Sequence, residues 1–321
     1  MRSFKKAFSL IEVIFVIVIL GIVASIASEI IVQVYENYLT QRAVFRVNYK
    51  TELAVNEIVN RLTYRIQGTT ISKDHIAFKS GNPTPNDWLP IEDVPTAGTK
   101  YTTIEWIGYD NDTFSSDKIP NWSGVANYQN ASISGFKTYG SDLNNSAKLI
   151  SYLSNGKVDL TQNRPASVIF MHNENYYNGV DEYSPECMGM IPELNSSTDC
   201  IFPVYIDSNS SFKFTRTKDP HSNTLRPKII TERYKLAWSA YALVPEPKGD
   251  GLFDLYLYSN YQPWNGESYL DPNTTKNILI DNVSVFKFSE NSGIIHFKLC
   301  IVERVSEENN ISTCKEKVVI R

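Results

Sequence analysis

The N-terminal part of the chain carries one long apolar run that a single acidic residue interrupts. Between Phe8 and Ser28 every residue is uncharged except Glu12. A run of about 20 apolar residues is what a helix needs to cross the hydrocarbon core of a bilayer. A carboxylate inside such a helix costs about 2.5 to 3.5 kcal/mol near the centre and less near an end, so it usually has a function. The pattern predicts a membrane-spanning helix in which Glu12 has a specific role.

The apolar run continues into a second helical pattern, which is amphipathic. Apolar positions recur at spacings of three and four, the period of a helix with one buried face: Val44, Val47, Thr51, Val55, Ile58, Leu62 and Ile66. Neither proline nor glycine occurs between Gly21 and Gly68, so no strong helix breaker interrupts this stretch. Glu57 and Arg61 are four residues apart, the spacing of a favourable ion pair. We expect one helix over residues 8–67, with its first half in a membrane and its second half against a sheet.

Past the helix the pattern changes to short strands and turns. Phe253, Leu255 and Leu257 occupy alternate positions, which is the period of a half-buried strand. Short connections at 248–251 and 290–293 indicate hairpins and antiparallel pairing. Strands are expected at Ile76–Phe78, Thr103–Tyr109, Tyr234–Val244, Phe253–Tyr258, Asn282–Phe288, Gly293–Val302 and Lys315–Ile320. The fold class is therefore α+β, a long N-terminal helix packed on an antiparallel β-sheet head.

The head, residues 68–321, is expected to have two parts. Residues 110–228 are polar and rich in Asn, Ser and Tyr, with short apolar islands, and we interpret them as a large loop-rich insertion. Residues 229–321 hold most of the predicted strands and form a C-terminal antiparallel sheet. With 42% hydrophobic and 12% aromatic residues among 321, the chain has enough apolar surface to build a core of this size.

The charge of the chain argues against broad nucleic-acid binding. The formal net charge is −4 at pH 7, and DNA-binding surfaces are basic. One stretch, residues 213–235, is instead rich in basic residues. We interpret this stretch as a solvated loop and strand edge, with a contact surface for DNA or an acidic partner as the alternative. Its basic residues are Lys213, Arg216, Lys218, Arg226, Lys228, Arg233 and Lys235.

The four cysteines fall into two pairs that are close in sequence. Cys187 and Cys200 lie in a stretch rich in Pro and Asn, and Cys300 and Cys314 lie near the C-terminus. Four cysteines allow three connectivities, and the short closed loops favour the sequential pairing of an exported protein. A metal site is not expected, because there is no Cys-x-x-Cys pair and the histidines are scattered.

No motif of a familiar catalytic centre is present. The chain lacks Gly-x-Ser-x-Gly, His-Glu-x-x-His, a Walker loop and Gly-x-Gly-x-x-Gly, so we expect no catalytic residue, no cofactor and no enzymatic activity. Asp110 and Asp112 have a metal-like spacing but lack the Gly and distal Glu of a calcium loop, so a turn is expected. The tryptophans and tyrosines are expected to fill a β core, with a glycan or peptide groove as the alternative. Acid-preceded Asn-x-Ser sequences leave glycosylation open at Asn144, Asn195, Asn209 and Asn310.

The N-terminal residues resemble the type IV prepilin signal of pilins and pseudopilins. That pattern has a short basic leader, a small residue before the cut, Phe at the new N-terminus, Glu at the fifth mature position and then an unbroken apolar helix. Here the basic residues are Arg2, Lys5 and Lys6, followed by Ala7, Phe8 and Glu12. The usual Gly before the cut is Ala7 in this chain, and because both are small we expect slower or equal processing.

The resemblance implies how the N-terminus is processed and used. Residues 1–7 would be a leader that a prepilin peptidase removes between Ala7 and Phe8, and the same enzyme would methylate the Phe8 amine. In the family, the acid at the position of Glu12 pairs with the N-terminal amine of a neighbouring subunit during assembly.

Two other N-terminal segments fit part of the same pattern. A secretory signal peptide also has a basic start and an apolar run, and Ser25–Ala27 is a passable cleavage site. A plain signal anchor is the second alternative. Both leave Glu12 without a role. In each case the basic leader stays in the cytoplasm and the remainder faces the periplasm or exterior.

The length and the late strand segment Asn277–Phe288 resemble the large minor pseudopilins of the J type and the minor pilins of the W type. The resemblance implies a subunit at or near the tip of a type II secretion, type IV pilus or DNA-uptake filament. It implies other pilin subunits, the prepilin peptidase, an inner-membrane assembly platform and the lipid bilayer as partners. The head would lie in the periplasm. The alternative is a membrane-anchored binding module, an adhesin or receptor, that does not polymerise.

Overall fold

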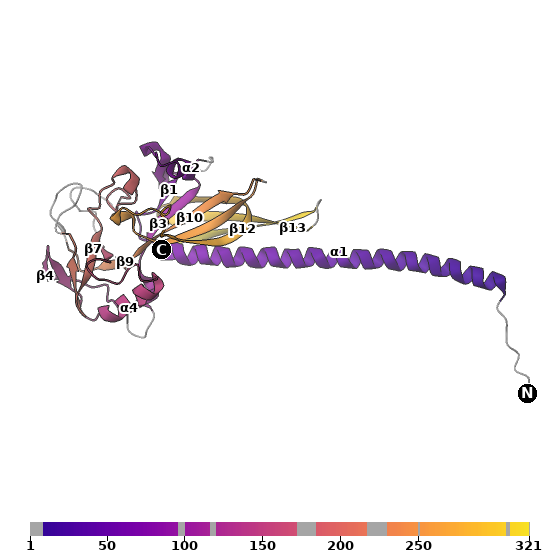
Figure 1. The fold of residues 1–321 in the computed structure, drawn as a ribbon, viewed down its shortest axis with the longest axis horizontal. Helices are drawn as coiled ribbons and strands as arrows, with labels where there is room; N and C mark the ends of the chain where they lie inside the picture. The colour runs from indigo at the N-terminus through magenta and orange to yellow at the C-terminus, as the bar shows by residue number, and fades with distance from the viewer. Residues whose placement is uncertain are drawn as a thin grey trace, which may run out of the picture. The chain divides into compact units, whose positions relative to one another are not determined.

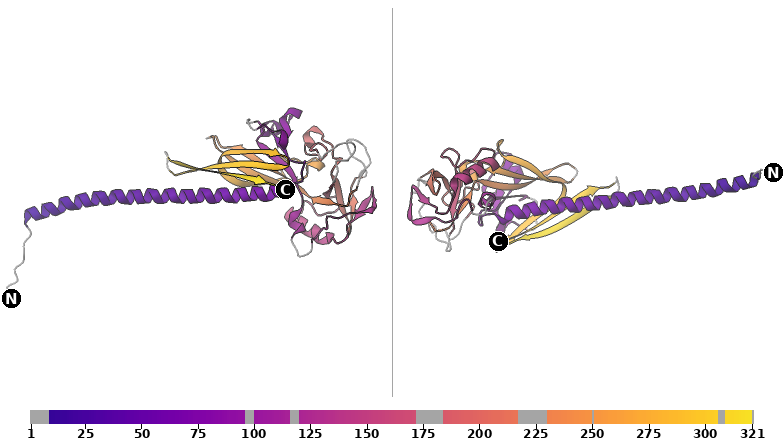
Figure 2. Two further views of the ribbon diagram at one scale, coloured as in Figure 1. Left: turned by 180° about the vertical axis from the view of Figure 1, so that it is seen from behind. Right: turned by 90° about the horizontal axis from the view of Figure 1, so that it is seen from below.

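The computed structural model describes residues 9–95, 100–115, 120–171, 184–216, 230–249, 251–305 and 309–320. Contacts between Cα atoms divide the chain into two compact units. The first is Met1–Lys50 with Val302–Thr313, and the second is Thr51–Ile301 with Cys314–Arg321. The second unit is the larger and holds the six-stranded sheet and most of the eight-stranded one; the ribbon is shown in Figures 1 and 2.

Helix α1 spans Leu10–Thr63 without interruption, and ends four residues before the predicted boundary at Gln67. It ends early because the following residues pair with a strand instead. The backbone N–H of Ile66 donates to the carbonyl of Ile107 at 2.8 Å, and the N–H of Tyr109 donates to the carbonyl of Tyr64 at 2.9 Å. The chain therefore passes directly from the helix into the sheet.

The buried face of α1 follows the predicted apolar stripe. Val47, Thr51 and Val55 are fully buried, and Ile58 and Leu62 are nearly so. Val44 is the exception, with 39% of its surface exposed. The predicted ion pair is present, with Nε of Arg61 2.8 Å from Oε1 of Glu57. The C-terminal part of this helix is thus the amphipathic element that the sequence predicted.

The larger antiparallel sheet contains eight strands in the order β14-β13-β12-β11-β10-β3-β1-β2. The predicted hairpins are confirmed, because Pro247 pairs with Phe253 and Asn291 pairs with Ile294. The strand bounds are β1 Ile71–Lys73, β2 Trp88–Pro90, β3 Thr103–Gly108, β10 Ser239–Pro247, β11 Phe253–Tyr261, β12 Thr275–Asn291, β13 Ile294–Arg304 and β14 Asn310–Val319. Apart from the segment at 76–78, every predicted strand matches a strand, and all but one of these matches lie in this sheet alone. The strand predicted at Tyr234–Val244 is two strands, β9 in the second sheet and β10 in this one.

The second sheet contains six strands in the order β4-β5-β8-β7-β6-β9. Its strands are β4 Asn127–Ser132, β5 Gly135–Lys137, β6 Ala166–Phe170, β7 Phe202–Ser208, β8 Ser211–Phe214 and β9 Tyr234–Ala237. Helix α4, Leu143–Leu153, belongs to the same region and begins where the Asp142 side chain accepts from the N–H of Asn145. The described parts of the segment 110–228 therefore hold more regular structure than the sequence indicated, because they supply β4 to β8 and much of an aromatic core.

The strand predicted at Ile76–Phe78 is wrong, because these residues form helix α2, His75–Lys79. The side chain of Asp74 accepts hydrogen bonds from the N–H groups of Ile76 and Ala77, which caps the helix start. The turn predicted at Asp110 is the start of another short helix, α3, Asn111–Phe114. Short 3-10 helices occur at Pro85–Asp87, Ile91–Asp93, Pro192–Leu194 and Pro263–Asn265.

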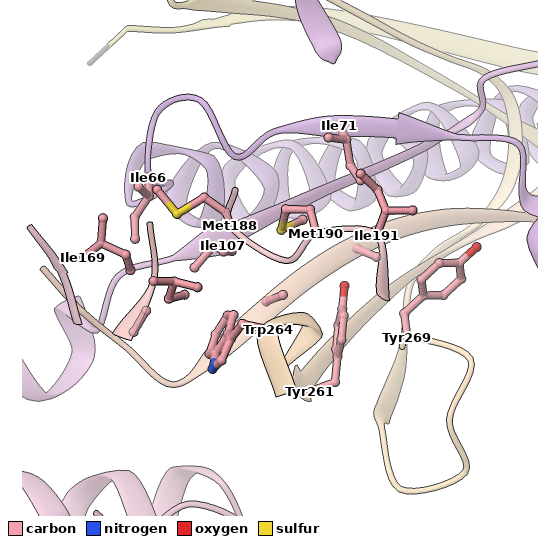
Figure 3. Packing of buried hydrophobic residues seen from close by; sticks show 14 of the residues in the cluster. Ile66, Ile71, Ile107, Ile169, Met188, Met190, Ile191, Tyr261, Trp264 and Tyr269 are labelled. Carbon is pink, nitrogen blue, oxygen red and sulfur yellow. The ribbon is translucent and has the colours of Figure 1, made fainter. Parts of the chain in front are cut away.

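A buried cluster lies beside the eight-stranded sheet and includes the first disulfide. Figure 3 shows Met188, Met190 and Ile191 packed near Ile107 and Trp264. Cys187 is joined to Cys200 and Cys300 is joined to Cys314, which is the predicted sequential pairing. The first disulfide closes the loop from Cys187 to Cys200, and both cysteines belong to this cluster. The second disulfide joins strands β13 and β14.

Candidate membrane segment and assembly residue

The N-terminal half of α1 exposes an apolar surface on all sides. By length and composition α1 can cross a membrane, and none of its most apolar window is buried inside the structure. A helix that is apolar all round needs either a protein core or lipid around it. The exposed apolar side chains include Leu10, Ile11, Val13, Ile14, Phe15, Val16, Ile17, Val18, Ile19, Leu20, Ile22, Val23 and Ile26.

Glu12 lies in the first turn of this helix, two residues after its start at Leu10. Its backbone N–H donates to the carbonyl of Ser9 at 3.0 Å, so the turn is already formed there. The N-terminus of a helix carries a partial positive charge, and a carboxylate in the first turn is favourable there. This position also lowers the cost of placing the charge in lipid, which is smaller near the end of a span than at its centre.

The Glu12 side chain makes no ion pair with any residue from 9 to 320 that the structure describes. Ala7 and Phe8, the predicted cleavage residues, lie outside the described residues. The site therefore consists of one carboxylate at the N-terminal end of an apolar helix. Such a group can form an ion pair or a hydrogen bond within a membrane, and it has no catalytic partner among the described residues.

An aromatic feature of α1 was missed in the sequence. Tyr35, Tyr38, Phe45 and Tyr49 are each more than half exposed. The rings of Phe45 and Tyr49 are stacked with their centroids 6.2 Å apart. Their spacing of four residues is a sequence signal for this contact. In the same unit, Nη1 of Arg46 lies 2.9 Å from Oε1 of Glu303.

Asp110 is a buried carboxylate in the head. It accepts hydrogen bonds from the indole groups of Trp122 and Trp238, each at 3.2 Å, and from the Thr113 hydroxyl. Burial raises the pKa of Asp110 to about 6, against the opposing effect of these hydrogen bonds. Asp110 therefore works as a buried acceptor that holds two tryptophans. No group of three His, Cys, Asp or Glu side chains among the described residues is arranged to hold a metal ion.

Comparison with known proteins identifies the N-terminal segment. Residues 2–28 match the family model of the prokaryotic N-terminal methylation motif. No curated protein and no solved structure matches the chain. The match includes Ala7, Phe8 and Glu12 and covers the first turns of α1. The chain thus carries a prepilin-type methylation motif at the start of a long apolar helix, and this combination is that of a membrane-anchored, pilin-like subunit.

Proposed function

We propose that this chain is a minor pseudopilin or pilin, a structural subunit at or near the tip of a type II secretion, type IV pilus or DNA-uptake filament. The observation that carries the proposal is the position of Glu12, in the first turn of an exposed apolar helix and inside the methylation motif. The large head of two sheets supports a minor role, because a bulky head fits a tip position more easily than a repeating one. Among minor subunits the J and W types are the ones it resembles.

The proposed processing follows from the motif. A prepilin peptidase cuts between Ala7 and Phe8 and methylates the new Phe8 amine. This divides the chain into a leader at 1–7, a helical region at 8–67 in which α1 ends at Thr63, and the head at 68–321. The new amine then lies four residues before Glu12, at the same end of α1.

The proposed assembly contact joins Glu12 to the Phe8 amine of a neighbouring subunit. A positive amine at a helix N-terminus is unfavourable, because the helix dipole has its positive end there. In lipid this amine needs a counter-charge, and leaving either partner of a buried ion pair alone is costly. Glu12 supplies that counter-charge in the correct layer of the membrane. Subunits that bring the two groups together are thereby stabilised in the filament.

The proposed location is the inner membrane, with a single span and the head in the periplasm. The basic residues Arg2, Lys5 and Lys6 keep the leader in the cytoplasm. The two disulfides support an oxidising compartment for the head. From there the other pilin subunits and the assembly platform would carry the subunit into the filament.

The test is to replace Glu12→Leu in the full chain at native expression level. We expect unchanged or higher abundance in the membrane, unchanged cleavage, and loss of co-purification with the other filament subunits. Glu29→Leu is the matched control, because Glu29 is an exposed acid of the same helix outside the apolar run, and it should co-purify normally. If Glu12→Leu co-purifies as well as the control and the parent system works, the chain is better described as an anchored binding module.

A further inference from the structure

Two buried residues of opposite charge lie side by side on neighbouring strands of the eight-stranded sheet. Lys73 is the last residue of β1 and Glu105 is in the middle of β3. In the antiparallel register Ile71 is opposite Glu105 and Lys73 is opposite Thr103, so the two side chains are diagonal neighbours on one face. Each side chain is only 1% exposed.

The contacts around this pair come from separate segments of the head. Nζ of Lys73 is 2.7 Å from Oε2 of Glu105 and donates to the carbonyl of Met190 at 3.2 Å. The hydroxyl of Tyr261 donates to the other oxygen of Glu105, Oε1, at 2.9 Å. Oε2 of Glu193 is 3.9 Å from Nζ. Figure 3 shows the neighbouring Met190, Tyr261 and Tyr269 side chains in the same cluster.

Lys73 and Glu105 are almost closed to solvent, and one carboxylate oxygen beside them has no hydrogen-bond partner. Nζ lies 4.6 Å from the ring centre of Phe78 and 5.8 Å from that of Tyr269. Among the described residues, Oε2 of Glu193 is buried without a hydrogen-bond partner, whereas Oε2 of Glu105 has the Lys73 ammonium at 2.7 Å. A buried acceptor without a partner costs about 1 to 3 kcal/mol, and more when it is charged. The ion pair alone therefore leaves this interior poorly satisfied.

We propose that Lys73 and Glu105 condense to an intramolecular amide that cross-links β1 to β3. The Nζ lone pair attacks the Glu105 carboxyl carbon and forms a C–N bond. The bond from that carbon to Oε2 then breaks, and Oε2 leaves with two protons as water. No oxidant, cofactor or second enzyme is needed, because an amine and a carboxylic acid give only an amide and water.

The neighbouring groups occupy the positions that this reaction needs. The Tyr261 hydroxyl points at Oε1, where negative charge develops in the tetrahedral intermediate, and it can stabilise that charge as an oxyanion donor. Burial raises the pKa of Tyr261, which keeps the donor protonated. Oε2 of Glu193, 3.9 Å from Nζ, is the second carboxylate oxygen near the amine, and a closer approach would let it accept a proton from Nζ and return it to the leaving oxygen. Burial also raises the pKa of Glu105, which favours the neutral acid as the group attacked.

The product satisfies the interior better than the ion pair does. The amide N–H keeps the Met190 carbonyl as its acceptor, and the amide carbonyl oxygen keeps the Tyr261 hydroxyl as its donor. Oε2 of Glu105, whose partner in the ion pair is the Lys73 ammonium, is the oxygen lost as water. Two buried charges are replaced by one neutral amide with both hydrogen bonds made. Reacting groups held in contact also react as if at very high concentration, about 10⁵ to 10⁸ M in favourable intramolecular cases.

The test is the mass of the full chain purified from membranes in detergent, measured after reduction of both disulfides. We expect a protein lighter than its processed sequence by one water, and a tryptic peptide in which the segments around Lys73 and Glu105 are joined. Lys73→Arg cannot form the amide and should show the full mass. Glu105→Gln can form the same amide by losing ammonia, so its cross-linked mass should equal that of the cross-linked wild type.

Glu193→Gln tests the proton carrier separately. A glutamine can still accept from the Ser268 hydroxyl, which donates to Oε1 of Glu193 at 2.9 Å, so the fold should be kept. We expect a folded protein with both disulfides and little or no cross-link. A wild-type chain with its full mass would overturn the proposal, and a fully cross-linked Glu193→Gln chain would overturn the role of Glu193. Neither result depends on whether the chain enters a filament.

Discussion

The indole N–H of Trp238 donates to Oδ1 of Asp110 at a distance of 3.2 Å. Trp238 is the one residue between β9, in the six-stranded sheet, and β10, in the eight-stranded sheet. The backbone N–H of Asp110 also donates to the carbonyl of Leu236 in β9, at 2.7 Å. Asp110 therefore fixes the chain at the point where it passes from one sheet to the other.

The protonation of Asp110 should make the stability of the head depend on pH. Its pKa rises from 3.8 to about 6 on folding, so the folded state binds the proton more tightly than the unfolded state. The sign follows from proton linkage: this contribution is fully present below about pH 4 and is lost as pH rises through about 6. The loss is about 3 kcal/mol at most. It should appear in denaturant unfolding curves recorded from pH 4 to 7.

Asp110→Asn should remove this part of the pH dependence, because the amide does not titrate. Asp112→Asn is the comparison variant, because the Asp112 charge is one of the causes that raise the pKa of Asp110, so its removal should move the pH dependence to lower pH without abolishing it. Equal profiles for the wild type and Asp110→Asn would show that Asp110 does not titrate in this range.

The mature chain should begin at Phe8 with a methylated amine. The methylation motif at residues 2–28 is the basis of this prediction. Mass spectrometry of the N-terminal peptide from membrane-purified protein gives the answer. A terminus at Ser28 would indicate a signal peptidase, and an intact Met1 would indicate a plain anchor. Either result contradicts the pilin interpretation.

The two disulfides should differ in what their removal costs. They close loops of similar length, with sequence separations of 13 and 14, so each should contribute about 3 kcal/mol by chain entropy. Cys187 and Cys200 are both buried in the core cluster, whereas Cys314 is exposed on β14. Replacing the first pair by serine therefore also buries two hydroxyl groups.

We expect the denaturant midpoint to fall further for the double variant Cys187→Ser/Cys200→Ser than for Cys300→Ser/Cys314→Ser. Both should be measured in the full chain under oxidising conditions. An equal or larger fall for the second pair would mean that the burial of the first pair adds nothing to its effect.

The C-terminal part of α1 should stabilise the head through its buried face. Ile58 is 2% exposed, and truncating such a side chain leaves a cavity that costs about 2 to 5 kcal/mol. Leu53 is on the same helix and is 53% exposed, so Leu53→Ala should change stability by about 0.5 kcal/mol or less. Unfolding of Ile58→Ala and Leu53→Ala by denaturant compares the two directly, and similar midpoints would contradict the packing described.

The sequence predicted the helix and the C-terminal sheet because their patterns are long and regular. The stripe from Val47 to Leu62 extends over several turns, and short hairpins join β10 to β11 and β12 to β13. The helix end at Thr63 could not be predicted from the sequence. It depends on the backbone hydrogen bonds that Tyr64 and Ile66 make with residues at the end of β3, some forty residues later in the chain. Periodicity describes an element, and it does not include competition for backbone groups from distant segments.

The six-stranded sheet was missed for a related reason. Its strands are short, and β4 is mostly exposed and polar, so the alternation that marks a half-buried strand is weak. Neighbouring strands β6 and β9 are far apart in the sequence, so no hairpin turn between them indicates that they pair. The apolar island that contains Ala166–Phe170 could be recognised in the sequence, but one apolar segment does not show which strands it pairs with. At residues 76–78, the cap supplied by Asp74 outweighed the strand preference of Ile76 and Phe78.

At the candidate site, Glu12 could be found from sequence because a charge in an apolar run is conspicuous. The pair Lys73 and Glu105 could not, because each is an ordinary charged residue in its own segment. Only the strand register brings them together with Tyr261 and the loop that carries Met190.

The direct passage from α1 into the sheet has a mechanical consequence. Tension that passes beyond the packed face of the helix would reach the sheet at Tyr64 and Ile66, which are hydrogen-bonded to the end of β3 and the residue after it. β3 is an interior strand, flanked by β10 and β1, and not an edge such as β14. A strand held on both flanks cannot be peeled off one bond at a time from a free side, so a pulling force would be shared over two rows of hydrogen bonds.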